Sequence, residues 1–211
     1  MKVCSTEQRI SLKKSKDFFP GYLAYYSENS PEYAFSPEEC QSIIDMHKSV
    51  DPSPAGIGVE RKRNTNTKIR STTLYPIYPN EESEWLYRRV IDIVNHANDT
   101  HFGYDVSHIV SPLSLLCYDS AADEPGHYDW HSDIGGNSHI TRKISFSAQL
   151  SDPSTYTECD LIVVDAGQNV APREQGSVSL FPSFAMHRVN PIETGKRWSL
   201  VTWVHGEVQF K

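Results

Sequence analysis

The pattern of apolar and polar positions divides the chain into a first half that predicts helices and a second half that predicts strands. Two segments of the first half, 36–51 and 80–98, carry apolar residues at helical spacing. The first begins with a capping box of Ser36 and Glu39, with Pro37 at the first helical position. The stripe of the second consists of Leu86, Val90, Ile93, Val94 and Ala97. Both segments are predicted amphipathic helices that need a partner surface.

From about residue 108 the pattern changes to short runs of β-branched and aromatic residues, divided by Gly, Pro, Asp and Asn. Runs of this kind without intervening helices are typical of a sandwich or a barrel. They are "SLLCY", "HYDWH", "KISFSAQL", "DLIVVDA", "GSVSLF" and "KRWSLVTWV". We therefore expect a single α+β domain that is mainly β. Its jelly-roll-like core spans 108–211, and residues 1–107 supply helical support and a rim loop.

Two of these runs indicate what lies on each side of the barrel wall. In "KISFSAQLS" an apolar face alternates with a small polar face, which is suited to line a pocket. The polar face consists of Ser145, Ser147, Gln149 and Ser151. In "RWSLVTWV" both faces carry large apolar groups, so we expect this strand to be covered on both sides. The barrel interior would cover one side and the helices the other.

Net charge, the length of apolar stretches and cysteine spacing argue against several classes of protein. The net charge of −7 over 211 residues argues against a surface that neutralises a nucleic-acid backbone. No apolar stretch reaches the length of a signal peptide core or a membrane span, so we expect a soluble, cytoplasmic protein without a membrane partner. The four cysteines are scattered without metal or redox spacing, which predicts reduced and mostly buried thiols. They are Cys4, Cys40, Cys117 and Cys159.

The stretch "GHYDWHSD" contains the His-x-Asp pattern twice, and either pair is a candidate for half of a metal site. His127 and Asp129 form the first pair, and His131 and Asp133 form the second. On a regular strand all four would share one face, so parity cannot choose between the pairs. The outer two residues would lie about 20 Å apart, so only one neighbouring pair can hold a single ion.

Two imidazoles and one carboxylate form the facial triad of non-haem Fe(II) oxygenases, so a second, remote histidine is required. The candidates are His139, His187 and His205. His187 has the most informative setting, because Arg197 follows ten residues later and opens an apolar strand. An inward-facing arginine is costly unless it meets an anion, and its planar fork is suited to bind a carboxylate.

Three segments carry a resemblance to a known family: "CYDSAADEPGHYDWHSD", "RKISFSAQLSDPSTY" and "GSVSLFPSFAMHRVNPIETGKRWSLVTWVHG". They resemble the Fe(II)/2-oxoglutarate-dependent dioxygenases, within them the prolyl 4-hydroxylase-like branch that includes bacterial Pro/Lys-hydroxylase-domain proteins. Such proteins have a double-stranded β-helix, or jelly-roll, fold. Their Gly-x-Tyr-x-x-His-x-Asp motif falls on Gly126, Tyr128, His131 and Asp133, which favours the second pair.

The same resemblance implies a full set of site residues. His131, Asp133 and His187 would hold Fe(II), and Arg197 would bind the distal carboxylate of 2-oxoglutarate. Further contacts to this co-substrate would come from Tyr118, Ser199 and Gln149. No catalytic residue beyond the iron ligands is expected.

The implied reaction is hydroxylation of a C–H bond with O₂ and 2-oxoglutarate, with release of succinate and CO₂ and with ascorbate as a supporting reductant. The implied substrate is a prolyl or other residue in a peptide or protein. A free amino acid or small molecule is the alternative. A cupin-like metal-binding module without oxygenase activity, or a zinc hydrolase, would also use such ligands. Relatives that dealkylate nucleic acids carry a second arginine six positions after the first, where this chain has Trp203, which disfavours that substrate.

Three features remain outside this assignment. The chain has Glu158-Cys159 where relatives usually have Gly-Gly, which questions the local turn. The basic segment 58–70 is either a loop that closes over the site or a solvated surface loop. His127 and Asp129 are expected beside the metal or at the rim of the site.

Overall fold

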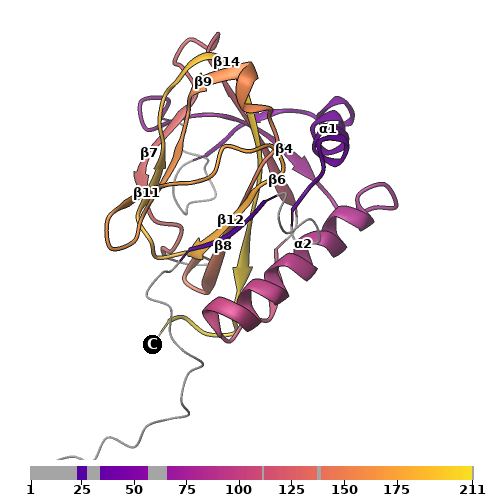
Figure 1. The fold of residues 1–211 in the computed structure, drawn as a ribbon, viewed down its shortest axis with the longest axis vertical. Helices are drawn as coiled ribbons and strands as arrows, with labels where there is room; N and C mark the ends of the chain where they lie inside the picture. Colours follow the sequence, from indigo (N-terminus) through magenta and orange to yellow (C-terminus); the bar gives the residue numbers. More distant parts are fainter. Residues whose placement is uncertain (1–22, 28–33, 57–65, 111, 137–138, 211) are drawn as a thin grey trace, which may run out of the picture.

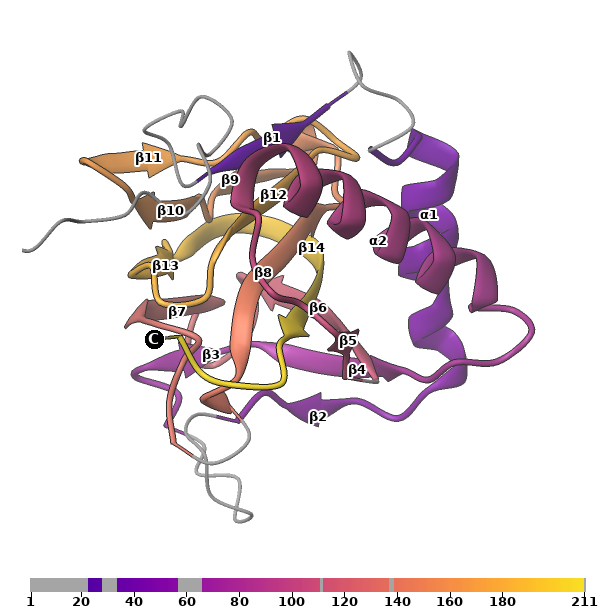
Figure 2. The ribbon, with the colours of Figure 1, turned by 90° about the horizontal axis from the view of Figure 1, so that it is seen from below.

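The computed structural model describes residues 23–27, 34–56, 66–110, 112–136 and 139–210, and these form two antiparallel sheets with helices on one side (Figures 1 and 2). The helical elements are α1 (Pro37–Asp45), the 3₁₀ turn η2 (Met46–Ser49), α2 (Glu84–Ala97), the π turn η3 (Asn98–Phe102) and the 3₁₀ turn η5 (Pro153–Thr155). Both predicted helices are therefore present, and the second begins four residues later than the predicted start at residue 80.

The larger sheet has nine strands, and its order mixes early and late segments of the chain. Its path runs through β1 (Ala24–Tyr26), β12 (Val178–Pro182), β8 (Arg142–Gln149), β14 (Ile192–His205), β6 (Leu113–Asp119), β4 (Thr73–Ile77) and β2 (Ser53–Pro54). Two short strands pair with β14 beside this path, β5 (His108–Ile109) and β9 (Tyr156–Glu158). Since β14 lies between β8 and β6, the last strand of the chain holds the middle of the sheet.

The smaller sheet has five strands and faces the larger one from the side opposite the helices (Figure 2). Its order is β11 (Gln168–Val170), β10 (Leu161–Val164), β13 (His187–Val189), β7 (His127–His131) and β3 (Arg70–Ser71). The fold is the mainly β jelly roll with supporting helices that the sequence predicts.

The helices pack on the outer face of the larger sheet, as their apolar stripes predict (Figure 2). Ser36 caps α1: its hydroxyl accepts from the Glu39 amide at 3.2 Å, and its own amide donates to the Glu39 carboxylate at 2.9 Å. All five predicted stripe residues of α2 are buried. Fully burying one such aliphatic side chain stabilises a fold by roughly 1.5–3 kcal/mol, so this stripe fixes the helix on the sheet.

Strand β14 separates the two interiors of the molecule. Leu200 and Val204 belong to the core beneath the helices, and Trp198 packs against it. The alternate residues line a cavity between the two sheets, and they are Arg197, Ser199, Val201 and Trp203. The expectation that both faces of this strand are covered is confirmed. The polar face of β8 also lines the cavity, through Ser145 and Ser147.

The sequence prediction missed four strands in the first half of the chain. Strands β1 to β4 have two to five residues each (Figure 2), and β1, β3 and β4 join the sheets through partners farther along the sequence. For example, β1 pairs with β12 and β3 pairs with β7. Strands of this length carry little alternation of their own, so pairing rather than local pattern defines them.

Two predictions from composition concern the described part of the chain only. Cys40, Cys117 and Cys159 are buried free thiols, as expected, and Cys4 lies outside the described residues. None of the helices described is long and apolar enough to span a membrane.

Candidate active site

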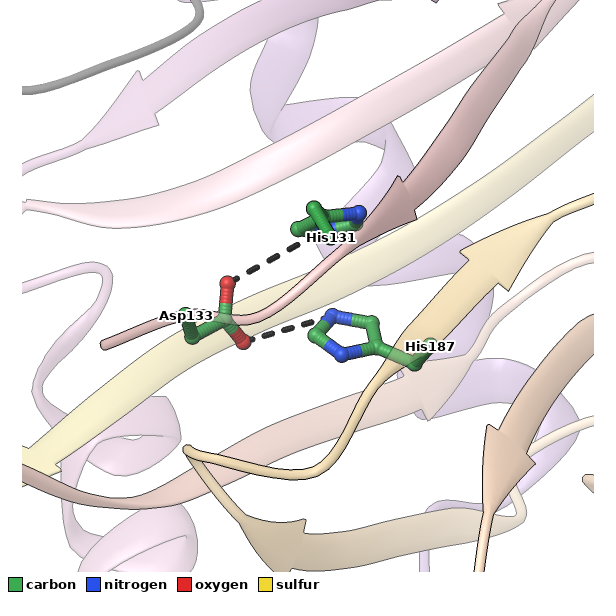
Figure 3. A group of neighbouring side chains, drawn as sticks. All are labelled: His131, Asp133 and His187. Atoms are coloured by element: carbon green, nitrogen blue, oxygen red, sulfur yellow. Dashed lines mark ion pairs between the residues drawn. The ribbon is translucent and has the colours of Figure 1, made fainter. Parts of the chain in front are cut away.

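Two histidines of the smaller sheet and an aspartate that follows β7 converge in the wall of the cavity (Figure 3). His131 ends β7, Asp133 follows two residues later, and His187 begins β13. In the sheet register His131 is the direct partner of His187. The Nε2 atom of His187 lies 3.4 Å from one Asp133 carboxylate oxygen, and that of His131 lies 3.8 Å from the other. The ligand atoms of all three residues lie within 4.8 Å of one another.

The two imidazoles present their Nε2 atoms to the cluster because their other nitrogens bond to backbone. His131 Nδ1 lies 2.8 Å from the Asp129 carbonyl, and His187 Nδ1 lies 2.9 Å from the Ala185 carbonyl. In each ring Nδ1 therefore donates, and Nε2 keeps its lone pair for a metal. Burial, followed by the neighbouring His187, lowers the pKa of His131 to about 3, so this ring is neutral at physiological pH.

The carboxylate of Asp133 is held in its charged form. Burial raises its pKa, but the nearby imidazoles of His187 and His131 and hydrogen bonds from Ser145 and Trp203 outweigh burial and lower it. The Ser145 hydroxyl donates to the carboxylate at 2.6 Å. Two imidazoles and one carboxylate are a donor set that suits Fe(II), and three protein ligands leave coordination positions open.

The glycine of the motif lets β7 start directly against β6. A Cβ atom built on Gly126 would lie 2.7 Å from the Tyr118 Cα and 2.7 Å from the Asp119 amide nitrogen. The Gly126 amide donates to the Asp119 carbonyl at 3.0 Å. A glycine is therefore required here by close backbone approach, which brings the start of β7 beside Tyr118.

The expectation that His127 and Asp129 share a face with His131 is wrong, because β7 contains a β-bulge. His131 pairs with His187, but Val189 pairs with Tyr128, so β7 has one residue more than β13 over this stretch. The bulge places Tyr128 and His131 in the cavity, with their rings stacked 3.5 Å apart.

The first His-x-Asp pair lies away from the cavity. Both ring nitrogens of His127 contact backbone carbonyls, of Pro125 at 2.8 Å and of Lys68 at 3.2 Å. The Asp129 side chain is exposed and accepts a hydrogen bond from the Trp130 amide. Of the three candidate remote histidines, only His187 belongs to the cluster. His139 lines the cavity, and His205 bonds Thr141.

Arg197 enters the same cavity from the larger sheet. The cavity has a volume of about 660 Å³, and Tyr118 and Ser199 also line it. The arginine is 5% exposed and forms no ion pair with an acid of the described chain. Gln149 lies behind it and accepts from its Nε atom at 2.8 Å, while the Gln149 amide donates to the Tyr156 hydroxyl at 2.9 Å. Gln149 thus fixes the guanidinium plane, and in the described structure it does not line this cavity.

The Glu158-Cys159 turn that departs from the family pattern keeps the backbone that two glycines would adopt. Glu158 has φ of 58° and Cys159 has φ of 64°, both in the left-handed region. This turn places the buried Cys159 thiol in hydrogen-bonding contact with the Arg197 guanidinium. The sequence marked the turn as unusual but did not connect it with the arginine, because that contact joins residues 38 positions apart.

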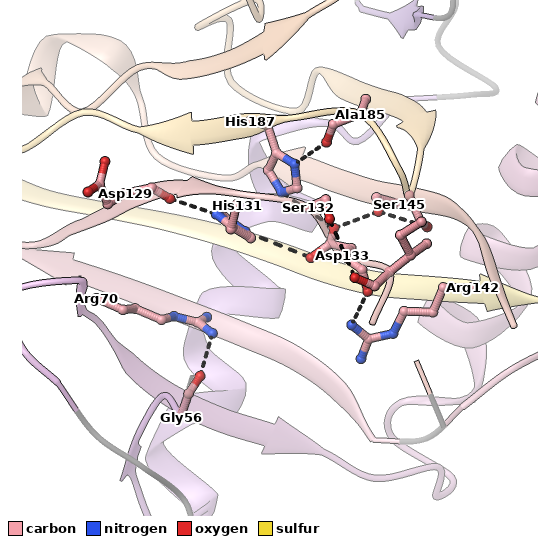
Figure 4. Close-up of polar contacts among 12 residues, drawn as sticks. Gly56, Arg70, Asp129, His131, Ser132, Asp133, Arg142, Ser145, Ala185 and His187 are labelled. Carbon is pink, nitrogen blue, oxygen red and sulfur yellow. Dashed lines mark hydrogen bonds and ion pairs between the residues drawn. The ribbon is translucent and has the colours of Figure 1, made fainter. Parts of the chain in front are cut away.

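Two further arginines line the cavity and were not among the predicted site residues. Arg70 stands on β3 and Arg142 begins β8 (Figure 4). The basic segment 58–70 gave one signal for Arg70, but residues 57–65 lie outside the described structure, so its proposed role as a closing loop stays a prediction.

Comparison with known proteins agrees with this geometry. Residues 113–205 match the sequence model of the 2OG-Fe(II) oxygenase superfamily, and they include the whole cluster and Arg197. The likeness to this superfamily therefore rests on that segment, which is less than half of the chain. Relatives named PKHD-type hydroxylases include one from Crocosphaera subtropica, 33% identical over 87 residues, and one from Pseudomonas putida W619, 28% identical over 109 residues. The matches cover 39% and 48% of this chain and 39% and 46% of those relatives, less than half of each.

Solved structures extend the likeness of fold to most of the chain. A Pseudomonas putida prolyl-4-hydroxylase has a TM-score of 0.67 at 15% identity, covering 88% of this chain and 93% of that one. A Trichoplax adhaerens prolyl hydroxylase, solved with a hypoxia inducible factor peptide fragment, has a TM-score of 0.66 at 15% identity, covering 88% and 84%. The helices and early strands outside residues 113–205 therefore belong to the shared architecture.

Proposed function

We propose that this protein is an Fe(II)- and 2-oxoglutarate-dependent dioxygenase that hydroxylates a C–H bond of a peptide or protein. In this proposal His131, Asp133 and His187 hold Fe(II), and Arg197 binds the distal carboxylate of 2-oxoglutarate. The observation that carries it is one cavity that holds both a cluster of two imidazoles and a carboxylate and a buried arginine that has no acidic partner among the described residues.

The residues fit both groups. The two Nε2 atoms and the charged carboxylate suit Fe(II), and hydrogen bonds to backbone carbonyls and from Ser145 orient these side chains before any metal binds. A buried guanidinium whose Nε is fixed by Gln149 leaves its outer edge for a carboxylate, which it can bind through two hydrogen bonds. Tyr118 and Ser199 line the cavity beside it as further polar contacts.

When bound, Fe(II) with 2-oxoglutarate and O₂ supplies the oxidising chemistry for C–H hydroxylation and yields succinate and CO₂. The chain contributes position and exclusion of water. The stacked Tyr128 and His131 rings and the Phe181 ring, 4.7 Å from His187, hold the ligands from the sides. Apolar side chains form much of the remaining wall, which keeps bulk water from a reactive centre.

The substrate that the likeness favours is a prolyl or other residue in a peptide or protein. It is supported by the names of the relatives and by the peptide fragment in the Trichoplax complex. Hydroxylation of a free amino acid is the alternative. A substrate screen with peptides and free amino acids would distinguish the two.

Two measurements test the proposal. The first is calorimetric binding of Mn(II), a redox-inert substitute for Fe(II), to His131→Ala and to His127→Ala. We expect the first variant to lose metal binding and the second to keep it, because both histidines lie on β7 but only one belongs to the cluster. The reverse result would contradict the assignment.

The second measurement is succinate formation from 2-oxoglutarate with Fe(II) and ascorbate. We expect the purified protein to form succinate and to bind 2-oxoglutarate, and Arg197→Ala to lose this binding. A protein that keeps its metal but neither binds nor turns over 2-oxoglutarate would be a cupin-like binding module instead.

A further inference from the structure

Arg70 and Arg142 occupy the same cavity as the metal cluster, on two different sheets. Arg70 comes from β3 of the smaller sheet and Arg142 from β8 of the larger. Figure 4 shows the two side chains extending toward each other from opposite sides of the His131 and Asp133 pair. Neither supplies a ligand atom to the metal cluster, and neither is the arginine assigned to 2-oxoglutarate.

Both guanidinium groups are fixed but only partly satisfied. One Nη atom of Arg70 donates to the Gly56 carbonyl at 3.1 Å, and its guanidinium lies 4.4 Å from the centre of the Tyr128 ring. One Nη atom of Arg142 donates to the Asp133 carbonyl at 3.1 Å, and its guanidinium lies 3.8 Å from the Trp203 ring. The Nε atom of each is buried and has no hydrogen-bond partner among the described residues.

Within the described structure, the lining of the cavity offers Arg70 and Arg142 no acidic partner of their own. Asp133 is the only acidic residue that lines the cavity within the described structure, and it belongs to the metal cluster. Neither arginine lies within ion-pair distance of an acid in the described chain. Fe(II) and Arg197 would be balanced by Asp133 and the two carboxylates of 2-oxoglutarate. The charges of Arg70 and Arg142 would then remain uncompensated in a partly desolvated cavity, which is costly without an anion.

We propose that Arg70 and Arg142 form a site for a carboxylate group of the substrate. This inference rests on the proposed function and deepens it, because it names the chemical class of the substrate. Guanidinium groups bind carboxylates through paired, charge-assisted hydrogen bonds. The two aromatic rings beneath them keep their planes in place, so little side-chain freedom is lost on binding.

The lining of the cavity also narrows the kind of acid. A free α-amino acid would bring an ammonium group, and in the described lining no carboxylate other than that of Asp133 could accept it. The site therefore fits a carboxylate without an adjacent ammonium. That carboxylate belongs to an acidic residue in a peptide or to a small organic acid, and two arms of the test separate these sources.

The test measures binding to the full chain loaded with Mn(II) and the unreactive 2-oxoglutarate analogue N-oxalylglycine, which occupies Arg197. Calorimetry compares N-acetylglutamate with N-acetylglutamine α-amide, in which both carboxylates are replaced by carboxamides, so that it is a neutral probe of the same shape. We expect the acid to bind about tenfold more tightly, the factor that corresponds to about 1.4 kcal/mol. The second arm compares the blocked peptides acetyl-Gly-Pro-Glu-Gly-amide and acetyl-Gly-Pro-Gln-Gly-amide. A preference for Glu there points to a peptide source, and a preference confined to N-acetylglutamate points to a small acid.

Variants assign the preference to the two arginines. Arg70→Gln and Arg142→Gln should each reduce it several-fold, and the double variant should abolish it. Arg188→Gln is the matched control, because Arg188 also stacks on an indole, 4.8 Å from the Trp130 ring, and also has a buried Nε without a partner in the described chain. Arg188 does not line the cavity in the described structure, so this control should keep the full preference.

Several outcomes would overturn the inference. Equal binding of the acidic probe and its amide counterpart to the unmodified protein refutes the inference. This comparison needs no variant, so it does not depend on whether a variant folds. A preference that survives in a folded double variant also refutes it, as does tighter binding of N-acetyl-O-phosphoserine than of N-acetylglutamate, which would indicate a phosphorylated substrate. Failure to bind Mn(II) and N-oxalylglycine would instead refute the proposed function, and this inference with it.

Discussion

Replacing Glu158 with glycine should stabilise the protein, because the native backbone at this position disfavours any residue with a Cβ atom. Glu158 has φ of 58° and precedes Cys159, which has φ of 64°. An L-residue in the left-handed region costs roughly 1–2 kcal/mol relative to the right-handed one. The Glu158 side chain is exposed, so its removal takes no apolar group out of the core.

The expected gain is the difference between two opposing effects. Glycine removes the strain of roughly 1–2 kcal/mol but loses more backbone freedom on folding, which costs roughly 0.5–1 kcal/mol. The net increase in the free energy of unfolding is therefore about 0–1.5 kcal/mol, with a central value of about 0.75 kcal/mol. For a domain of this size about 1 kcal/mol shifts Tm by about 2–4 °C, so we expect Tm to rise by about 1–4 °C.

Thermal unfolding of two comparison variants shows whether the gain comes from the left-handed backbone at residue 158. Glu193→Gly changes an exposed glutamate of β14 with ordinary φ, so it should lower Tm. Cys159→Gly relieves the same strain but removes a buried thiol that contacts Arg197, so it should weaken 2-oxoglutarate binding. The reasoning is refuted if Glu158→Gly lowers Tm as much as Glu193→Gly does.

The same turn illustrates what the sequence could and could not predict. The presence of Glu158 and Cys159 where relatives usually have two glycines was visible as a departure from the family pattern. Their contact with Arg197 was not, because it depends on how β9 pairs with β14 across a register shift. The helices were predictable for the opposite reason, since the capping box and the apolar stripes are local features of the chain.

The metal cluster was only partly predictable from the sequence. Strand parity alone treated both His-x-Asp pairs as equal and placed them on one face. The bulge between Tyr128 and His131 breaks that parity, and a bulge is set by the partner strand rather than by the bulged residues. Arg70 and Arg142 were missed for a related reason, because they face one cavity from two sheets and share no sequence motif.

Two further predictions follow from the contacts around the cluster. Ser145→Ala removes the 2.6 Å hydrogen bond to Asp133, and losing such a partner of a metal-binding carboxylate should weaken Mn(II) binding about tenfold in calorimetry. Ser147→Ala, on the same face of β8, should leave it unchanged, and equal losses in both variants would contradict the role of that bond. For the metal-free protein, burial and then Arg142 lower the pKa of His205 to about 4, while an unfolded histidine has a pKa of about 6.5. Between these two pKa values the unfolded chain binds a proton at this histidine and the native state does not. The free energy of unfolding therefore falls as pH drops from about 6.5 to about 4. His205→Asn should make Tm less sensitive to pH over that window, and a profile as steep as that of the unmodified protein would show that another group causes the acid sensitivity.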